Sequence, residues 1–309
     1  MTYRGIKIGL ALGSGSARGW SHIGVIKELQ NLGIQPDIVC GSSIGAIVGA
    51  AYVNNNLSQL EEWVTSLTRL QVATFLSVNL SLNGFVNRER LSHFLSKHVC
   101  DPAQDLQHLP KKFACVATEL VSGREIWITK GAVLDAVWAS TALPGLFPPV
   151  RSQGAWLVDG GLVNPVPVSV CRALGAEVVI AVNLNGDILG RHFEKREIVV
   201  EQQEDNIVSK LLDKAKGYSA LFFEEDRPED VPPSLFEAVA SSINITQDRI
   251  TRSRMAGDPP EILLSPKLSK IGLLEFYRAG EAIAEGHECV TRLRSEIESV
   301  LGPLPADSD

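Results

Sequence analysis

The amino-acid sequence predicts a three-layer α/β/α fold in which helices cover both faces of a mostly parallel central sheet. Three observations lead to this prediction. Two consecutive strand, loop and helix units open the chain, strand-like and helix-like segments alternate up to about residue 185, and 45% hydrophobic residues in a chain of 309 suffice for a substantial core. Consecutive units of this kind build right-handed parallel sheets.

The first two units are defined by a change in the spacing of apolar residues. Short β-rich runs end at glycines, and each is followed by a segment in which apolar residues recur at helical intervals. In order, the prediction is a strand at 6–12, a loop at 13–19, a helix at 20–32, a strand at 37–40, a tight turn at 41–45 and a helix from 46 to 53.

The rest of the chain continues the alternation and then changes character. One domain over residues 1–309 is expected, with a catalytic core at about 6–185, a charged variable insertion or mobile cap at about 186–233, and C-terminal helices at about 234–302. Further strands are predicted at 112–119, 125–129, 155–158, 178–183 and 261–264, and further helices at 131–142, 168–174, 235–255 and 273–301.

Composition narrows the class of protein. The formal charge of −7, with scattered Lys and Arg, leaves no basic field for nucleic acid. The five cysteines form no C-x-x-C pair, which is typical of reduced thiols in the cytoplasm. No signal-peptide core and no apolar stretch of about 18 residues is present, so any membrane contact is expected to be peripheral, at the inner face. A homo-oligomer is left open but not indicated.

The pentapeptide Gly41-Ser42-Ser43-Ile44-Gly45 has the G-x-S-x-G pattern of a nucleophile elbow, between a predicted strand and a predicted helix. A serine on so sharp a turn needs glycine two residues before and after it, because a Cβ there would collide with the strand or the helix. The helix N-terminus behind the turn favours developing negative charge. The pattern predicts Ser43 as a nucleophile and Ser42 as a bystander.

The glycine-rich loop at 13–19 predicts a site for an anion. Its glycines miss the G-x-G-x-x-G frame of dinucleotide-binding loops by one residue, and Arg18 occupies the last position of that frame. A loop of this kind presents backbone N–H groups, and adjacent parallel strands bring their carboxyl ends to one edge of a sheet. We therefore expect this loop to face Ser43 as an oxyanion hole.

The turn Asp159-Gly160-Gly161 follows an apolar strand, so the carboxylate of Asp159 is also expected at the carboxyl end of a strand. A serine hydroxyl is a poor nucleophile without a base, and an aspartate is a weak base unless burial raises its pKa. The sequence thus predicts that three turns meet at one rim of the sheet.

The loop at 13–19, the pentapeptide at 41–45 and the turn at 159–161 together resemble the patatin-like phospholipases. The segments 20–25 and 139–149 look like the bacterial branch related to neuropathy target esterase. The resemblance covers the predicted α/β core, and its motifs stand in the family's order. It implies the patatin-like fold and hydrolysis of fatty-acyl esters of lipids or phospholipids, as an esterase or lysophospholipase that forms an acyl-enzyme.

The resemblance also implies a Ser–Asp dyad, with Ser43 as nucleophile and Asp159 as general base, and neither a cofactor nor a metal. The backbone N–H groups of Gly15 and Ser16 would bind the oxyanion, and Arg18 would steady the loop or attract an anionic head group. Where many relatives have an unbroken glycine run, this chain has Ser14 and Ser16, and a serine at an oxyanion position requires a backbone angle that tolerates a Cβ. The glycines expected to support the loop and the turns are Gly13, Gly19, Gly41, Gly45 and Gly160.

Alternatives stay open at this point. A protein with this fold that binds or regulates without useful turnover is one, and a Ser-Asp-His esterase completed by His192 or His287 is another. A thioester or a small soluble ester is a third alternative, for the substrate.

Several other residues carry expectations about packing. His22 is expected to pack inside its helix, and Trp156 is expected in the core. Residues 67–85 are either a lipid-facing flap or an internal helix and loop, and Phe147 with the two prolines after it is a candidate lining of an acyl pocket.

Overall fold

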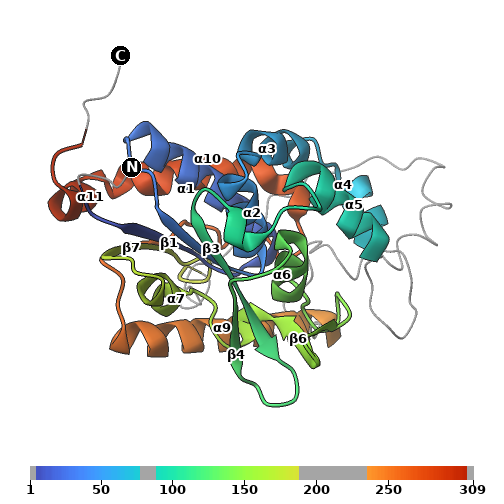
Figure 1. Ribbon diagram of the computed structural model, residues 1–309. Coiled ribbons are helices and arrows are strands. Elements are labelled where there is room, and N and C mark those ends of the chain that lie inside the picture. Colours follow the sequence, from blue (N-terminus) through green and yellow to red (C-terminus); the bar gives the residue numbers. More distant parts are fainter. Residues whose placement is uncertain (1–4, 77–87, 188–234, 305–309) are drawn as a thin grey trace, which may run out of the picture.

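The computed structural model describes residues 5–76, 88–187 and 235–304. The sheet among these residues has eight strands in the order β5-β6-β3-β2-β1-β7-β8, and β4 pairs with β3 outside this path. Helices lie on both faces of the sheet (Figure 1). The predicted three-layer fold with a mostly parallel sheet is confirmed. The strands are β1 (Ile8–Leu12), β2 (Ile38–Ser42), β3 (Lys112–Glu119), β4 (Glu125–Ile128), β5 (Val150–Ser152), β6 (Ala155–Asp159), β7 (Val178–Val182) and β8 (Ile262–Leu264).

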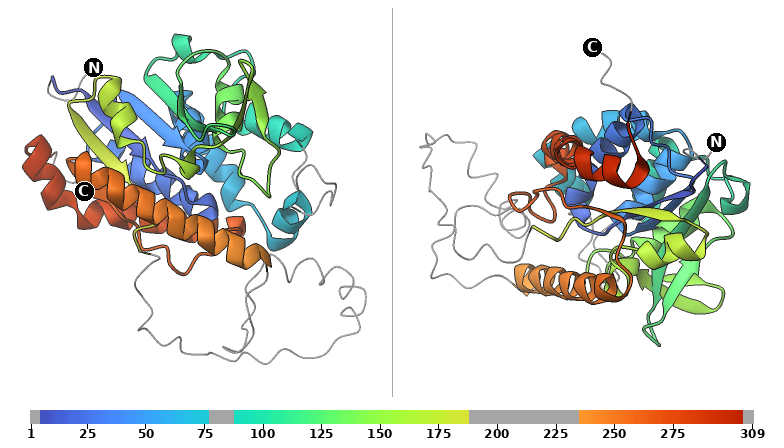
Figure 2. Two further views of the ribbon diagram at one scale, coloured as in Figure 1. Left: turned by 90° about the horizontal axis from the view of Figure 1, so that it is seen from below. Right: turned by 90° about the vertical axis from the view of Figure 1, so that its left-hand side faces the viewer.

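Two groups of helices form the outer layers. One group, which includes α1, α2 and α10, covers one face of the sheet, and α7 and the long helix α9 cover the other (Figures 1 and 2). The helices are α1 (Ser21–Asn31), α2 (Ile44–Val53), α3 (Leu57–Thr65), α4 (Arg69–Leu76), α5 (Arg88–His98), α6 (Val133–Ser140), α7 (Val168–Ala173), α9 (Leu235–Gly257), α10 (Ala279–Arg292) and α11 (Arg294–Leu301), with short 3-10 turns η1 (Ser16–Trp20), η2 (Leu106–His108), η3 (Gly160–Leu162) and η4 (Phe276–Arg278).

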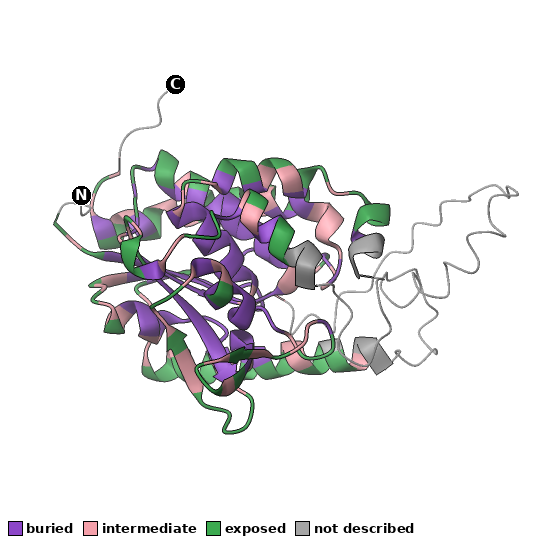
Figure 3. Cartoon of the chain, turned by 45° about the vertical axis from the view of Figure 1, so that its right-hand side comes forward, coloured by how far each residue is buried: buried purple, intermediate pink, exposed green. Residues whose placement is uncertain are grey.

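The core divides at the sheet, as the alternation of side chains along a strand requires. In β1, Leu10 and Leu12 belong to the large cluster shared with α1, α2 and α10, whereas Ala11 belongs to a smaller cluster of Ala, Val and Cys under α7. Small residues are needed on that second face because α7 approaches closely: a Cβ at Gly9 would lie 2.9 Å from the Cβ of Cys171. Figure 3 shows the sheet buried between the two layers.

Strands β2 and β6 meet end to end along one edge of β3. Antiparallel β4 pairs with residues 115–118 on one edge of β3. On the other edge, β2 runs parallel to β3 until Ser42 lies opposite Val116, and β6 arrives antiparallel until Asp159 lies opposite Ala117. The end of one strand therefore faces the end of the other. Asp159 therefore follows a strand that runs antiparallel to β2 and β3, and its turn still converges with that of Ser43.

Helices α1 and α10 cross at two glycines. A Cβ at Gly24 would lie 1.9 Å from the carbonyl oxygen of Ile283, and a Cβ at Gly286 would lie 2.0 Å from that of Ser21. The backbones thus approach too closely for any side chain at these positions. This contact fixes α1, which follows η1 directly, against the C-terminal part of the chain.

Several expectations need correction. The segment predicted as one helix from 273 to 301 is broken: residues 273–275 are not helical, and the helices are η4, α10 and α11. Trp156 is 46% exposed rather than in the core, because it lies at the start of β6 beside the short β5, where the ring of Trp156 stacks under Arg151. The predicted insertion at 186–233 lies outside the described residues apart from its first two positions.

The remaining sequence expectations concern cysteines and membranes. The five cysteines are all free and buried. No helix in the described part of the chain combines the length and the apolar character needed to cross a membrane.

The α1–α10 crossing gives a test of the fold. Gly24→Ala places a methyl group against the α10 backbone at Ile283, which is fixed by its own helix, so we expect the free energy of unfolding to fall by about 3 kcal/mol. Gly280→Ala, on the same α10, is the matched control: no atom lies within 4 Å of its Cβ, and the loss of glycine in a helix stabilises by up to about 1 kcal/mol. Urea unfolding measures both, and equal effects of the two variants would contradict the close approach.

Candidate active site

Ser43 occupies a strained turn between β2 and α2. Its backbone has φ 56° and ψ −124°, a conformation that costs of order 1–3 kcal/mol and persists only where the surroundings enforce it. A Cβ at Gly45 would lie 2.1 Å from the carbonyl oxygen of Leu12, and one at Gly41 would lie 2.5 Å from Cα of Ala46. Both glycines are therefore required by backbone contacts. The turn directs the Ser43 hydroxyl to Asp159, with 2.6 Å between Oγ and Oδ2.

Asp159 is held by hydrogen bonds on three sides and is 1% exposed. Its second carboxylate oxygen accepts from the N–H of Gly161 at 2.7 Å. Its own N–H donates to the carbonyl of Ala142, and its carbonyl accepts from the Thr118 hydroxyl. Burial raises the pKa of Asp159 from 3.8 to about 6, against the opposing effect of the hydrogen bonds from Ser43 and Gly161. A carboxylate with such a pKa is a far better base than an exposed one.

The last residue of α6 and the segment that follows it support both halves of this pair. The hydroxyl of Ser140 accepts from the backbone N–H of Ser43 at 3.0 Å, and the Ala142 carbonyl holds Asp159 as described. The sequence marked this segment only through the family-like run at 139–149, and no local pattern identified the contacts. Ser140 thus joins the residues that fix the site.

The glycine-rich loop presents two backbone donors. The N–H groups of Gly15 and Ser16 donate to no other described residue, and both residues line the pocket that contains Ser43. A Cβ at Gly15 would lie 2.7 Å from the side chain of Leu184, and one at Gly19 would lie 2.3 Å from that of Ile44. Ser16 has φ 54°, an angle that serine adopts at a cost of about 1–2 kcal/mol.

Contacts with several parts of the chain hold this loop. The N–H of Gly13 donates to Val182, and its carbonyl accepts from Nε2 of the buried His22 at 2.8 Å. Burial lowers the pKa of His22 to about 4, so the ring is neutral and Nε2 carries the proton. The N–H of Ala17 donates to the Leu273 carbonyl, which explains why that segment is not helical. His22 packs in its helix, as expected.

Arg18 is buried, with 2% exposed surface, and forms no ion pair with any described carboxylate. Its Nη2 donates to Oδ1 of Asn244 on α9 at 3.0 Å. Burial lowers its pKa to about 10, which still leaves the guanidinium charged near neutral pH. The Asn244 contact favours the loop-steadying role over that of a head-group ligand.

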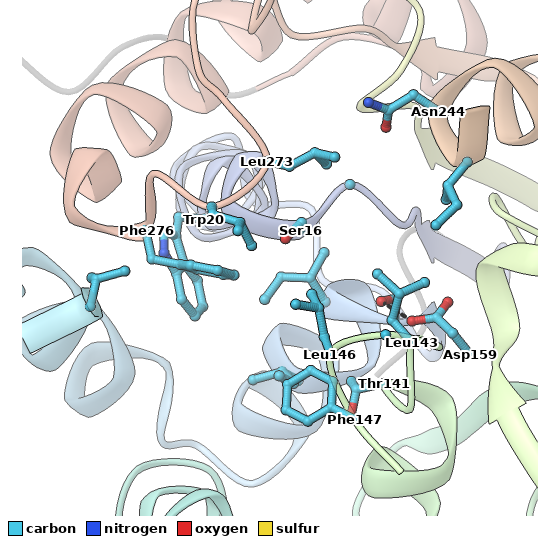
Figure 4. A pocket seen from close by; sticks show the side chains of 18 of the residues that line it. Ser16, Trp20, Thr141, Leu143, Leu146, Phe147, Asp159, Asn244, Leu273 and Phe276 are labelled. Atoms are coloured by element: carbon cyan, nitrogen blue, oxygen red, sulfur yellow. Dashed lines mark hydrogen bonds between the residues drawn. The ribbon is translucent and has the colours of Figure 1, made fainter. Parts of the chain in front are cut away.

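A cavity of about 600 Å³ opens from Ser43 and Asp159. Figure 4 shows Asp159 at one end and Trp20 with Phe276 at the other, with apolar side chains between them. Phe147 lines the cavity, whereas the two prolines after it do not. Leu67 and Val72 line it as well, and the part of the predicted flap at 77–85 lies outside the described residues. The main apolar lining comes from Trp20, Ile47, Leu143, Leu146, Phe147 and Phe276.

The structure does not bring His287 to this site. His287 lies on α10, where it pairs with Glu28 at 2.8 Å, and it does not line the cavity. His192 lies outside the described residues. Within the described residues, no group of three or more His, Cys, Asp and Glu side chains gathers as metal ligands do.

Comparison with known proteins adds a family to this geometry. The family model for patatin-like phospholipases matches residues 10–172. The chain belongs to the patatin-like phospholipase family. An NTE family protein of Mycobacterium tuberculosis is 30% identical and covers 94% of this chain and 92% of its own length. The lysophospholipase NTE1 of Coccidioides immitis is 29% identical over 99% of this chain and 18% of its own length. The resemblance stated above is confirmed, and the protein is a lipid ester hydrolase.

Among solved structures, VipD from Legionella pneumophila is similar over 94% of this chain and 77% of that chain, with 14% identity and a TM-score of 0.34. The type III effector protein ExoU is similar over 96% of the present chain and 63% of the ExoU chain, with 15% identity and a TM-score of 0.24.

Burial of Asp159 predicts a pH-dependent cost to stability. The rise of its pKa from 3.8 to about 6 corresponds to about 3 kcal/mol against the folded state above pH 6, where the carboxylate is ionised whether folded or not. The cost shrinks as the pH falls below 6 and is lost below about pH 3, where the carboxylate is protonated in both states. Asp159→Asn should therefore be more stable than the wild type at pH 8, by up to about 3 kcal/mol, and equally stable at about pH 3. Chemical unfolding at the two pH values measures this, and an Asn variant less stable than the wild type at pH 8 would contradict a carboxylate whose burial outweighs its hydrogen bonds.

Proposed function

We propose that this protein is a lysophospholipase or related esterase that hydrolyses a single fatty-acyl ester through a Ser43–Asp159 dyad. The observation that carries the proposal is the 2.6 Å hydrogen bond between the Ser43 hydroxyl and a buried carboxylate whose pKa lies near 6. Both groups line an apolar cavity, together with Gly15 and Ser16, whose N–H groups donate to nothing in the described part of the chain. This arrangement supplies a nucleophile, a base, oxyanion donors and room for a chain.

In the first half of the proposed reaction, Asp159 accepts the proton of Ser43 while Oγ attacks the ester carbonyl carbon. The carbonyl oxygen becomes an oxyanion that accepts hydrogen bonds from the N–H groups of Gly15 and Ser16. The C–O bond to the alcohol then breaks, and Asp159 returns the proton to the leaving oxygen. The fatty acyl group is left as an ester on Ser43.

In the second half, water replaces the alcohol. Asp159 takes a proton from the water as it attacks the acyl-enzyme, and the same donors stabilise the second oxyanion. When the bond to Oγ breaks, Asp159 gives the proton to Ser43, and the fatty acid leaves. Asp159 thus acts alternately as base and acid, which a pKa near 6 suits better than one near 4.

The cavity has room for an acyl chain. Its volume is about 600 Å³ and its lining is mainly apolar, which suits a fatty-acyl group with its ester. Relatives named lysophospholipase agree with such a substrate.

A lipid substrate also implies contact with a membrane surface. We propose peripheral contact near the cavity mouth, where Val239 of α9 lines the cavity and is 46% exposed. The formal charge of −7 argues that such contact is apolar rather than an attraction to anionic lipids.

Substitution of the two neighbouring serines tests the nucleophile. Ser43→Ala should lower hydrolysis of a lysophospholipid by at least about 10⁴-fold, since no hydroxyl then remains to form the acyl-enzyme. Ser42→Ala is the matched control, because Ser42 Oγ is buried with no hydrogen-bond partner among the described residues, and it should keep most of the activity. Release of fatty acid is measured with lysophospholipid, diacyl phospholipid and an acyl thioester. Turnover by Ser43→Ala would overturn the proposal, and preference for the thioester would change the substrate class.

The pKa of Asp159 predicts the pH dependence of the reaction. The free enzyme must hold Asp159 ionised to accept the Ser43 proton, so kcat/KM should fall about tenfold per pH unit below a midpoint near pH 6. An enzyme that keeps its full kcat/KM down to pH 4 would contradict Asp159 as the base.

A further inference from the structure

We propose that Gln247, on α9, is a positioning residue that holds the oxyanion loop in register with the Asp159 turn. The inference rests on the proposed function, because it concerns where the donors of that reaction lie. Gln247 comes from a part of the chain that the sequence motifs did not touch, and it lines the cavity next to both turns.

The side-chain oxygen of Gln247 joins two loops. Oε1 accepts from the hydroxyl of Ser14 at 3.1 Å and from Nδ2 of Asn185 at 3.0 Å, and the residue is 5% exposed. Ser14 directly precedes Gly15, the first of the two free N–H donors. Asn185 follows β7, whose neighbour β1 leads into the same loop. A buried amide oxygen with two donors is well satisfied, and its removal leaves both donors without an acceptor.

The other end of the amide lies against the Asp159 turn. A Cβ at Gly161 would lie 2.6 Å from Nε2 of Gln247, 2.9 Å from Oδ1 of Asp159 and 2.9 Å from the hydroxyl of Ser14. The three side chains therefore surround one glycine. Gln247 packs on the oxyanion loop and on the base turn at once, so it fixes the distance between them.

A second residue of α9 acts on the same loop. Asn244 lies three positions before Gln247, on the same face of the helix, and accepts from Nη2 of Arg18 at 3.0 Å. The contacts of Ser14 and Arg18 bracket Gly15 and Ser16 on both sides. Helix α9 thus binds the loop on both sides of the two donors, through Ser14 before them and Arg18 after them.

The loop needs such support because its conformation is strained. Ser16 has φ 54°, and a residue in this region keeps its conformation only when neighbouring contacts enforce it. If the loop relaxed, its N–H groups would move away from the oxyanion. A misplacement of about 1 Å in catalytic geometry costs up to about 100-fold in rate. Binding of the acyl chain by the apolar cavity would be little affected.

Two variants of Gln247 and one control test the inference in the full-length protein. Gln247→Leu keeps the volume but removes the acceptor, and kcat for a lysophospholipid should fall about 10- to 100-fold with little change in KM. Gln247→Glu keeps the acceptor for Ser14 and Asn185, so kcat at alkaline pH should be largely restored. Arg249→Leu, on the exposed side of the same helix, should leave kcat unchanged.

The Glu variant has a further readout that general damage to the fold would not produce. The pKa of Asp159 is set by burial and by its bonds to Ser43 and Gly161. A carboxylate across Gly161 adds like charge, so the midpoint of the acid limb of kcat/KM should move to higher pH.

The outcomes separate this inference from the proposed function. If Ser43→Ala abolishes turnover but Gln247→Leu keeps the wild-type kcat, the positioning role is overturned and the dyad stands. If Gln247→Leu does not fold, the Glu variant decides. A restored kcat together with a raised midpoint of the acid limb of kcat/KM supports the inference. An unmoved midpoint, or a fall in kcat accompanied by an equally large change in KM, overturns it. Turnover by Ser43→Ala removes the proposed function and this inference together.

Discussion

The site depends on one constraint: the carboxylate of Asp159 must stay out of water while it touches the Ser43 hydroxyl. Desolvation raises the pKa of Asp159, the hydrogen bonds from Ser43 and Gly161 offset only part of that rise, and the net pKa is about 6. The sheet meets the constraint by bringing β2 and β6 end to end on one edge of β3, so that Ser43 and Asp159 face each other without a connecting loop in between. Replacement of either turn by a more open one would hydrate the carboxylate and lower its pKa.

Such a site is unfavourable for stability, and the surrounding structure compensates. Ser43 and Ser16 have strained backbones, and both Asp159 and Arg18 are charged groups taken out of water. Close backbone contacts, hydrogen bonds and a large apolar cluster offset these costs. Because the proposed reaction needs the strain and the dry carboxylate, variants that relieve them are expected to gain stability as they lose activity.

Much of the fold was predictable because the relevant signals are local. Glycine spacing identified the elbow and the loop, and apolar periodicity placed β1, β2, β3 and β7 within a residue or two. The direction of β6 was not predictable, because the sequence of a five-residue strand does not indicate which strand it pairs with or in which direction. The break at 273–275 and the exposure of Trp156 depend on contacts far away in the sequence. For the same reason Ser140 and Gln247, single polar residues in ordinary helical patterns, gave no signal until their partners were known.

The most direct test of the Ser43–Asp159 dyad is the rate at which a fluorophosphonate reacts with Ser43, with the modified residue located by peptide mass spectrometry. The phosphorus centre reacts quickly only with a serine whose proton a nearby base accepts. The proposed dyad predicts one adduct, on Ser43, that forms faster as the pH rises through about 6 and at least about 100-fold more slowly in Asp159→Asn. An adduct on another residue, or equal rates in the two proteins, would contradict it.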